Sequence, residues 1–102
     1  MLDFTKQKKK FHPVKMPDGT VLNLLMPKKK LFEQMAGFEN DDGETVHDVA
    51  ELYSITAEIL STNLQKKQYT ADEIGEWFDL EDVRALYSEY LEFVSKIANN
   101  PN

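Results

Sequence analysis

The sequence predicts an α+β fold, mostly α, in which an N-terminal β-hairpin is followed by about four helices packed as a small antiparallel bundle. The hairpin is predicted because Pro17, Asp18 and Gly19 form a turn sequence between two short segments of extended type. The helices are predicted because later segments repeat apolar residues at the 3.6-residue spacing of an amphipathic helix. Short connections favour helices that are neighbours on one side of the small sheet.

The predicted hairpin covers residues 11–26. Pro17 sets φ for a turn and Gly19 can adopt a positive φ, which predicts a type I turn that closes into a bulge. Pro13 lacks a backbone donor and therefore fits an edge strand. Successive residues of the second strand alternate between two faces. One face carries Leu22, Leu24 and Met26, and the other carries Val21, Asn23 and Leu25. Both faces are partly apolar, which is more than a hairpin packed on one side requires.

Two helices are expected next. The first follows Pro27 and the three lysines over 28–30, groups Leu31, Phe32 and Met35, and ends near Gly37. The second begins at a cap formed by Thr45 and Asp48 and runs to about Lys67. Its apolar face consists of Val46, Val49, Leu52, Tyr53, Thr56, Ile59, Leu60 and Asn63.

Two capped helices are expected to complete the bundle. Thr70 and Glu73 form a capping-box sequence before a short helix that carries Trp77 and Phe78. We expect these two aromatic residues to anchor the core, and a binding hot spot is the alternative. The last helix covers 79–98 and is capped by Asp79, with Asp82 at its third position. Its apolar stripe consists of Val83, Leu86, Tyr87, Tyr90, Leu91, Val94, Ile97 and Ala98.

The length and composition predict one intracellular domain. The 102 residues suffice for one modest core, and we expect a flexible basic leader over 1–9 and a single domain over 10–102. Cysteine is absent, which excludes disulfides and thiolate metal sites. The acidic loop sequence over 38–44 does not have the spacing of a calcium-binding EF-hand, so no metal is expected. No apolar run approaches the length of a membrane span.

The charge is distributed unevenly along the chain. Residues 1–30 hold eight lysines against Asp3 and Asp18, whereas residues 31–102 hold four basic and sixteen acidic residues. Three roles are compatible with the basic end: a solvated device for solubility, docking onto an acidic surface, or binding to nucleic acid. The net charge of −6 disfavours nucleic acid, because phosphates would be repelled.

The sequence contains no recognisable catalytic arrangement. His12 lies in the hairpin and His47 in the first turn of a helix, but no serine lies in a nucleophile motif and no glycine-rich phosphate loop occurs. We therefore expect a structural or surface role for both histidines, and neither enzymatic activity nor a cofactor. Interaction with another protein is the remaining class of function.

The sequence also resembles the tail assembly chaperones of long-tailed bacteriophages and prophages. The resemblance covers about 10–102 and is carried by the hairpin with its PDG turn, by MPKKKLFEQM over 26–35, and by EILSTNLQKKQYTADEIGEWFDLEDVRALYSEYLEFVSKIANNPN over 58–102. It implies a cytoplasmic protein of the bacterial host, absent from the mature virion, that binds the tape measure protein, keeps it soluble and assists polymerisation of the tail tube. In many members a frameshifted longer form is thought to recruit the tail tube protein.

Partner binding is predicted at the second face of the hairpin and the first short helix, through Val21, Leu25, Phe32 and Met35. The hairpin also presents a strand edge that could pair with a second copy, so a homo-oligomer is compatible with this pattern. The competing hypothesis is a small regulatory or nucleic-acid-associated phage protein. Its phosphate-binding arm would consist of Lys6, Lys8, Lys9 and Lys10.

Overall fold

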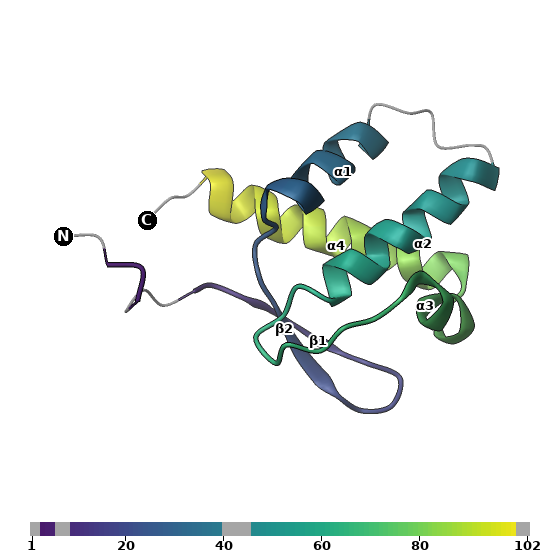
Figure 1. Cartoon of the computed structure of the whole chain (residues 1–102), viewed down its shortest axis with the longest axis horizontal. Helices are drawn as coiled ribbons and strands as arrows, with labels where there is room; N and C mark the ends of the chain where they lie inside the picture. Colours follow the sequence, from purple (N-terminus) through teal and green to yellow (C-terminus); the bar gives the residue numbers. More distant parts are fainter. Residues whose placement is uncertain (1–2, 6–8, 40–45, 100–102) are drawn as a thin grey trace.

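A hairpin and four contacting helices build the protein (Figure 1). The computed structural model describes residues 3–5, 9–39 and 46–99. In chain order the elements are β1 (His12–Lys15), β2 (Val21–Leu24), α1 (Lys29–Glu39), α2 (Val46–Leu60), α3 (Ala71–Trp77) and α4 (Leu80–Asn99). The predicted fold class, a mostly helical α+β fold with an N-terminal hairpin followed by four helices in contact, is confirmed. Within the described part of the chain, no helix combines the length and hydrophobicity needed to cross a membrane.

The turn of the hairpin forms as its sequence predicts. The N–H of Gly19 donates to the carbonyl of Met16 (2.9 Å), and the N–H of Met16 donates to the carbonyl of Thr20 (2.7 Å). Gly19 adopts a φ of +91°, a left-handed conformation that favours glycine. The strands pair antiparallel, with His12 opposite Leu24 and Lys15 opposite Val21.

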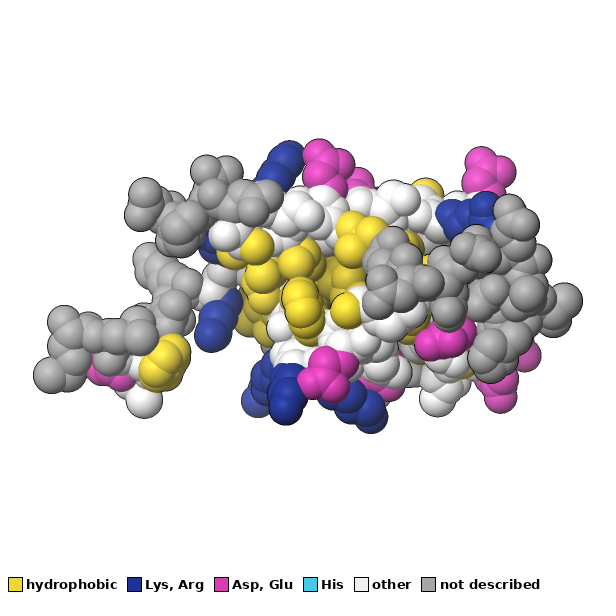
Figure 2. Space-filling view, turned by 90° about the horizontal axis from the view of Figure 1, so that it is seen from above, with side chains coloured by type: hydrophobic (Ala, Val, Ile, Leu, Met, Phe, Trp, Pro, Cys, Tyr) yellow, Lys and Arg dark blue, Asp and Glu magenta, His cyan; other side chains and the backbone are white. Residues whose placement is uncertain are grey.

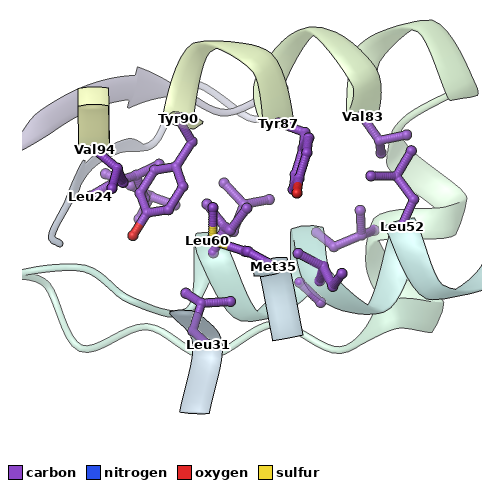
Figure 3. Packing of buried hydrophobic residues seen from close by; sticks show 14 of the residues in the cluster. Leu24, Leu31, Met35, Leu52, Leu60, Val83, Tyr87, Tyr90 and Val94 are labelled. Carbon is purple, nitrogen blue, oxygen red and sulfur yellow. The ribbon is translucent and has the colours of Figure 1, made fainter. Parts of the chain in front are cut away.

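Helix α2 is the centre of the core. It contacts α1, α3, α4 and β2. Most of its second half is buried, with Ile55, Ile59 and Leu60 fully buried, whereas Ser54 and Glu58 face solvent. Figure 3 shows how α4 lies along it: Leu52 faces Val83 at one end, and Val94 lies beside Leu24 of the sheet at the other.

Helix directions follow from the connection between α2 and α3. Helices α1 and α2 are antiparallel, whereas α2 and α4 both run from right to left in Figure 1. The segment 61–70 returns along the sheet before α3 begins, so α4 starts again at the end where α2 started. Helix α4 belongs to the core, because Val83 and Tyr90 are fully buried.

Two helix ends differ from the predicted positions, α1 by two residues and α2 by about seven. Helix α1 continues past Gly37 to Glu39, because Phe38 packs against the core and contacts the Tyr87 ring edge-on at 5.5 Å. Helix α2 ends at Leu60 rather than near Lys67.

The early end of α2 has a local cause. Ser61 and Thr62 donate their hydroxyls to the carbonyls of Ala57 and Glu58, at 2.7 and 2.8 Å. Asn63 donates its side-chain amide to the carbonyl of Leu60 at 2.7 Å. These side chains satisfy the last carbonyls of the helix, and residues of this type favour helix ends over helix interiors.

Both predicted caps of the later helices form. Thr70 and Glu73 make a reciprocal capping box at the start of α3. Asp79 and Asp82 make the equivalent pair before α4, with N–H to carboxylate distances of 3.1 and 2.9 Å. The cap predicted for α2, at Thr45 with the side chain of Asp48, lies outside the described residues, as does the side chain of His47. The acidic loop predicted over 38–44 is described only at Phe38 and Glu39, and these two residues belong to α1 instead.

Candidate protein-binding surface

The sheet is wider than the hairpin. The segment after α2 lies beside β2 through a bridge between Leu24 and Asn63. The N–H of Leu25 donates to the carbonyl of Thr62 (2.9 Å), and the N–H of Leu64 donates to the carbonyl of Asn23 (3.0 Å). Residues 62–65 therefore lie along the open edge of β2 and pair with it through this one isolated bridge. The regular sheet has two strands, and for brevity we call residues 62–65 the third strand.

The register assigns each side chain of this layer to one of two faces. Residues opposite each other in a sheet share a face, and successive residues alternate. Leu22 and Leu24 are fully buried against the helices, and Asn63 beside Leu24 is 6% exposed. We call the opposite face, which points away from the helices, the outer sheet face. It consists of Phe11, Pro13, Lys15, Val21, Asn23, Leu25, Thr62 and Leu64.

The outer sheet face is largely apolar yet open to solvent. Val21 is 51% exposed, Phe11 47% and Leu64 45%. Leu25 is half-buried and Pro13 is exposed. Isolated exposed apolar residues are common on protein surfaces, but a group on one small sheet is typical of a docking surface.

The four residues predicted to bind a partner do not all lie on this face. Val21 and Leu25 share it. Phe32 is 57% exposed but belongs to α1, which packs on α2. Met35 is only 4% exposed and belongs to the core, so its predicted place in an exposed surface is wrong. The reason is helical spacing: Leu31 and Met35 are four residues apart and both face α2, whereas Phe32 points about 100° away.

Sequence-based prediction does not place Leu64 on the sheet, because the predicted second helix includes it. Ser61, Thr62 and Asn63 form a run of residues that favour helix ends, and this signal could have revealed the end of the helix. Once the helix ends there, Leu64 no longer belongs to a helical stripe and becomes available to the sheet.

Strand β1 forms the other edge of the sheet, as Pro13 predicts. The backbone groups of Asn23 bond away from β1, to Leu64 and to the Gln65 side chain (2.9 Å). Pro13 lies opposite Asn23, so its own backbone groups also point away from β2. At this outward-facing position the missing N–H of proline removes no hydrogen bond from the sheet. The same missing donor disfavours pairing of this edge with a second copy.

A second apolar area lies on the upper side of the molecule. Figure 2 shows a band of hydrophobic side chains over α1 and the neighbouring part of α4, bordered by basic and acidic side chains. Phe32 is the large hydrophobic residue of α1 that is most exposed. The two apolar areas thus involve different elements of the fold.

A small open pocket lies between β1 and α4. Its volume is about 220 Å³, and its lining consists of His12, Glu89, Glu92, Phe93 and Lys96. His12 Nε2 lies 3.0 Å from Glu89 Oε2, without the geometry of a directed hydrogen bond. The imidazole also contacts the Phe93 ring, with centroids 5.6 Å apart. Because this lining has no hydroxyl or thiol, it does not assemble a nucleophile with a base. The contacts fix β1 against α4.

Trp77 corrects another expectation. It is 40% exposed and packs edge-on against Tyr69, with centroids 5.9 Å apart, whereas Phe78 is packed against the core. Helix α3 has only seven residues, and its buried position is Ile74. Helical spacing turns Trp77 to the flank of that buried face, so it does not anchor the core.

A buried tyrosine hydroxyl links the helices to the sheet. The Tyr90 hydroxyl donates to the carbonyl of Leu25 at 2.6 Å, and burial raises the pKa of Tyr90. This bond joins α4 to the end of β2 and helps hold the sheet against the helices.

Within the described residues, no group of three His, Asp or Glu side chains lies close enough together to hold a metal ion.

Comparisons with family models, curated proteins and solved structures each found no match to this chain. A functional assignment therefore depends on the chemistry of the surfaces described above.

Proposed function

We propose that this protein is a tail assembly chaperone of a bacteriophage or prophage, which binds the tape measure protein and keeps it soluble during assembly of the tail. Two lines of support are independent of each other. The first is the resemblance of residues 10–102 to that family. The second, which carries the proposal, is the apolar outer sheet face, which is exposed on the side of the sheet that points away from the buried core.

The physical argument concerns what such a surface can bind. A long client made of apolar-striped helices needs several modest apolar contacts, not one deep pocket. Covering Val21 and Leu64, each about half exposed, would contribute about 1 kcal/mol per side chain. Contacts of this size hold a client reversibly, which suits a protein that must release it.

The experiment is co-purification with a tape measure protein encoded beside this chain. The test variant is Val21→Thr with Leu64→Gln, which removes apolar contact and adds no charge. We expect it to weaken binding about thirtyfold, from the loss of about 2 kcal/mol. Phe32→Gln tests the band over α1 in the same assay, and circular dichroism checks that each variant is folded. Unchanged binding by the folded double variant would refute the outer sheet face as the binding surface.

A further inference from the structure

The sheet layer is basic, although the protein as a whole is acidic. Residues 9–27 and 61–69, which form this layer and its flanks, hold five lysines and one aspartate, Asp18. The whole chain nevertheless has a net charge of −6. Helices α3 and α4 carry much of the acidic excess, with Asp and Glu in both first turns. The sheet layer thus carries an excess of positive charge, and α3 and α4 carry an excess of negative charge.

The lysines border the outer sheet face on two sides. Lys15 lies opposite Val21 and shares its face. Lys9 and Lys10 precede Phe11 in the chain and are exposed. On the opposite border, the exposed pair Lys66 and Lys67 directly follows the third strand. Exposed lysines thus flank the apolar area on two sides.

The one carboxylate in this layer is already engaged. Asp18 accepts a hydrogen bond from the backbone of Thr20 at 3.0 Å. That bond, together with the Thr20 hydroxyl and the nearby charge of Lys67, lowers the pKa of Asp18. Asp18 thus stabilises the turn through its hydrogen bond to Thr20. No other carboxylate within residues 9–27 and 61–69 competes with a partner for the border lysines.

We propose that the outer sheet face binds an amphipathic polypeptide segment whose apolar residues are flanked by Asp and Glu. The inference rests on the proposed function in taking a polypeptide client as the occupant. Complementary charge at a rim mainly directs orientation and accelerates association, while the apolar centre supplies contact area. The acidic layer of α3 and α4 would repel the same segment, which directs it to the sheet.

Two other occupants fit the surface less well. Two copies joined face to face would bring their lysine borders together, and like charges oppose that contact. Single-stranded nucleic acid stacks its bases on aromatic side chains. Among the eight residues of the outer sheet face, Phe11 is the single aromatic one, and the other apolar residues are aliphatic or proline.

The test uses two synthetic amphipathic peptides with identical apolar positions, one flanked by Glu and one by Lys. Fluorescence anisotropy with the full chain measures the affinity of each. We expect the Glu-flanked peptide to bind at least about tenfold more tightly at low salt, with the difference shrinking as salt screens the rim. Lys15→Glu with Lys67→Glu should abolish or invert this preference.

The matched control is Lys28→Glu with Lys30→Glu, which makes the same change of charge at the start of α1. It should leave the preference intact. Equal binding of the two peptides, or an equal effect of both double variants, would overturn the inference. Displacement of the Glu-flanked peptide by a single-stranded DNA oligonucleotide at lower concentration would also overturn it, in favour of nucleic acid.

The outcomes separate this inference from the proposed function. If the Glu-flanked peptide binds as expected but the tape measure protein does not co-purify, the surface chemistry stands and the chaperone assignment fails. If the tape measure protein binds through Val21 and Leu64 without any charge preference in the peptides, the chaperone assignment stands and the acidic flanks are wrong.

Discussion

Asn63 holds the third strand in place, and its replacement offers a sharp test of the fold. The residue is 6% exposed. Its side-chain Nδ2 donates to the carbonyls of Leu60 (2.7 Å) and Lys67 (2.9 Å), and its Oδ1 accepts from the N–H of Lys67 (3.0 Å). Asn63→Asp keeps the shape but replaces the donor with an oxygen that faces two carbonyl oxygens. Losing two hydrogen bonds and creating this repulsion should cost about 2 to 4 kcal/mol near neutral pH.

The cost should depend on pH with a defined sign. Facing carbonyls in a buried site disfavour a charged carboxylate, so the pKa of the carboxyl group that N63D introduces should be raised in the folded state. When folding raises the pKa of a carboxyl group, that group destabilises the protein as pH rises above the pKa that it has in the unfolded chain. For aspartate this unfolded pKa is about 3.9. The destabilisation by N63D should therefore be smallest in acid, where the carboxyl is protonated and can donate one bond.

Chemical denaturation at several pH values measures this effect. Asn63→Ala removes the same bonds without a charge, so the difference between the two variants isolates the pH-dependent part. Gln65→Glu is the matched control: it makes the same change of charge two residues away, and its oxygen can still accept from the N–H of Asn23. We expect this control to change stability by less than about 0.5 kcal/mol. The reasoning is refuted if N63D is as stable as the control, or if N63D and N63A differ equally at all pH values.

Three further outcomes are expected. Tyr90→Phe should destabilise the fold by about 1 to 2 kcal/mol in urea denaturation, because the carbonyl of Leu25 loses its donor; a change near zero would mean that water replaces the hydroxyl. Met35→Ala should cost about 2 to 5 kcal/mol, whereas Phe32→Ala on the exposed side of α1 should cost much less, and equal losses would contradict the observed burial. Pro13→Thr adds an outward N–H to the edge of β1 and should increase concentration-dependent association in analytical ultracentrifugation; association no greater than that of the parent chain would contradict the edge argument.

Local signals in the sequence determined much of this protein. The PDG turn with Gly19, the capping box of Thr70 and Glu73, and the final amphipathic helix all form as predicted. Each of these depends on residues a few positions apart, whose preferred backbone conformations and hydrogen bonds are decided within one turn. The edge position of Pro13 belongs to the same group, because the lack of an N–H is a property of the residue itself.

Tertiary structure alone decided which apolar residues stay exposed. Met35 and Phe32 are both large and apolar and lie in the same helix, yet one is buried against α2 and the other faces solvent. Leu64 joined the outer sheet face only because the chain after α2 returned to β2, a contact between residues about forty positions apart. Periodicity can identify a stripe, but it does not say how much of the stripe the rest of the chain will cover. That depends on long-range packing, and here it left the outer face of the sheet largely apolar, flanked by lysines and open to solvent.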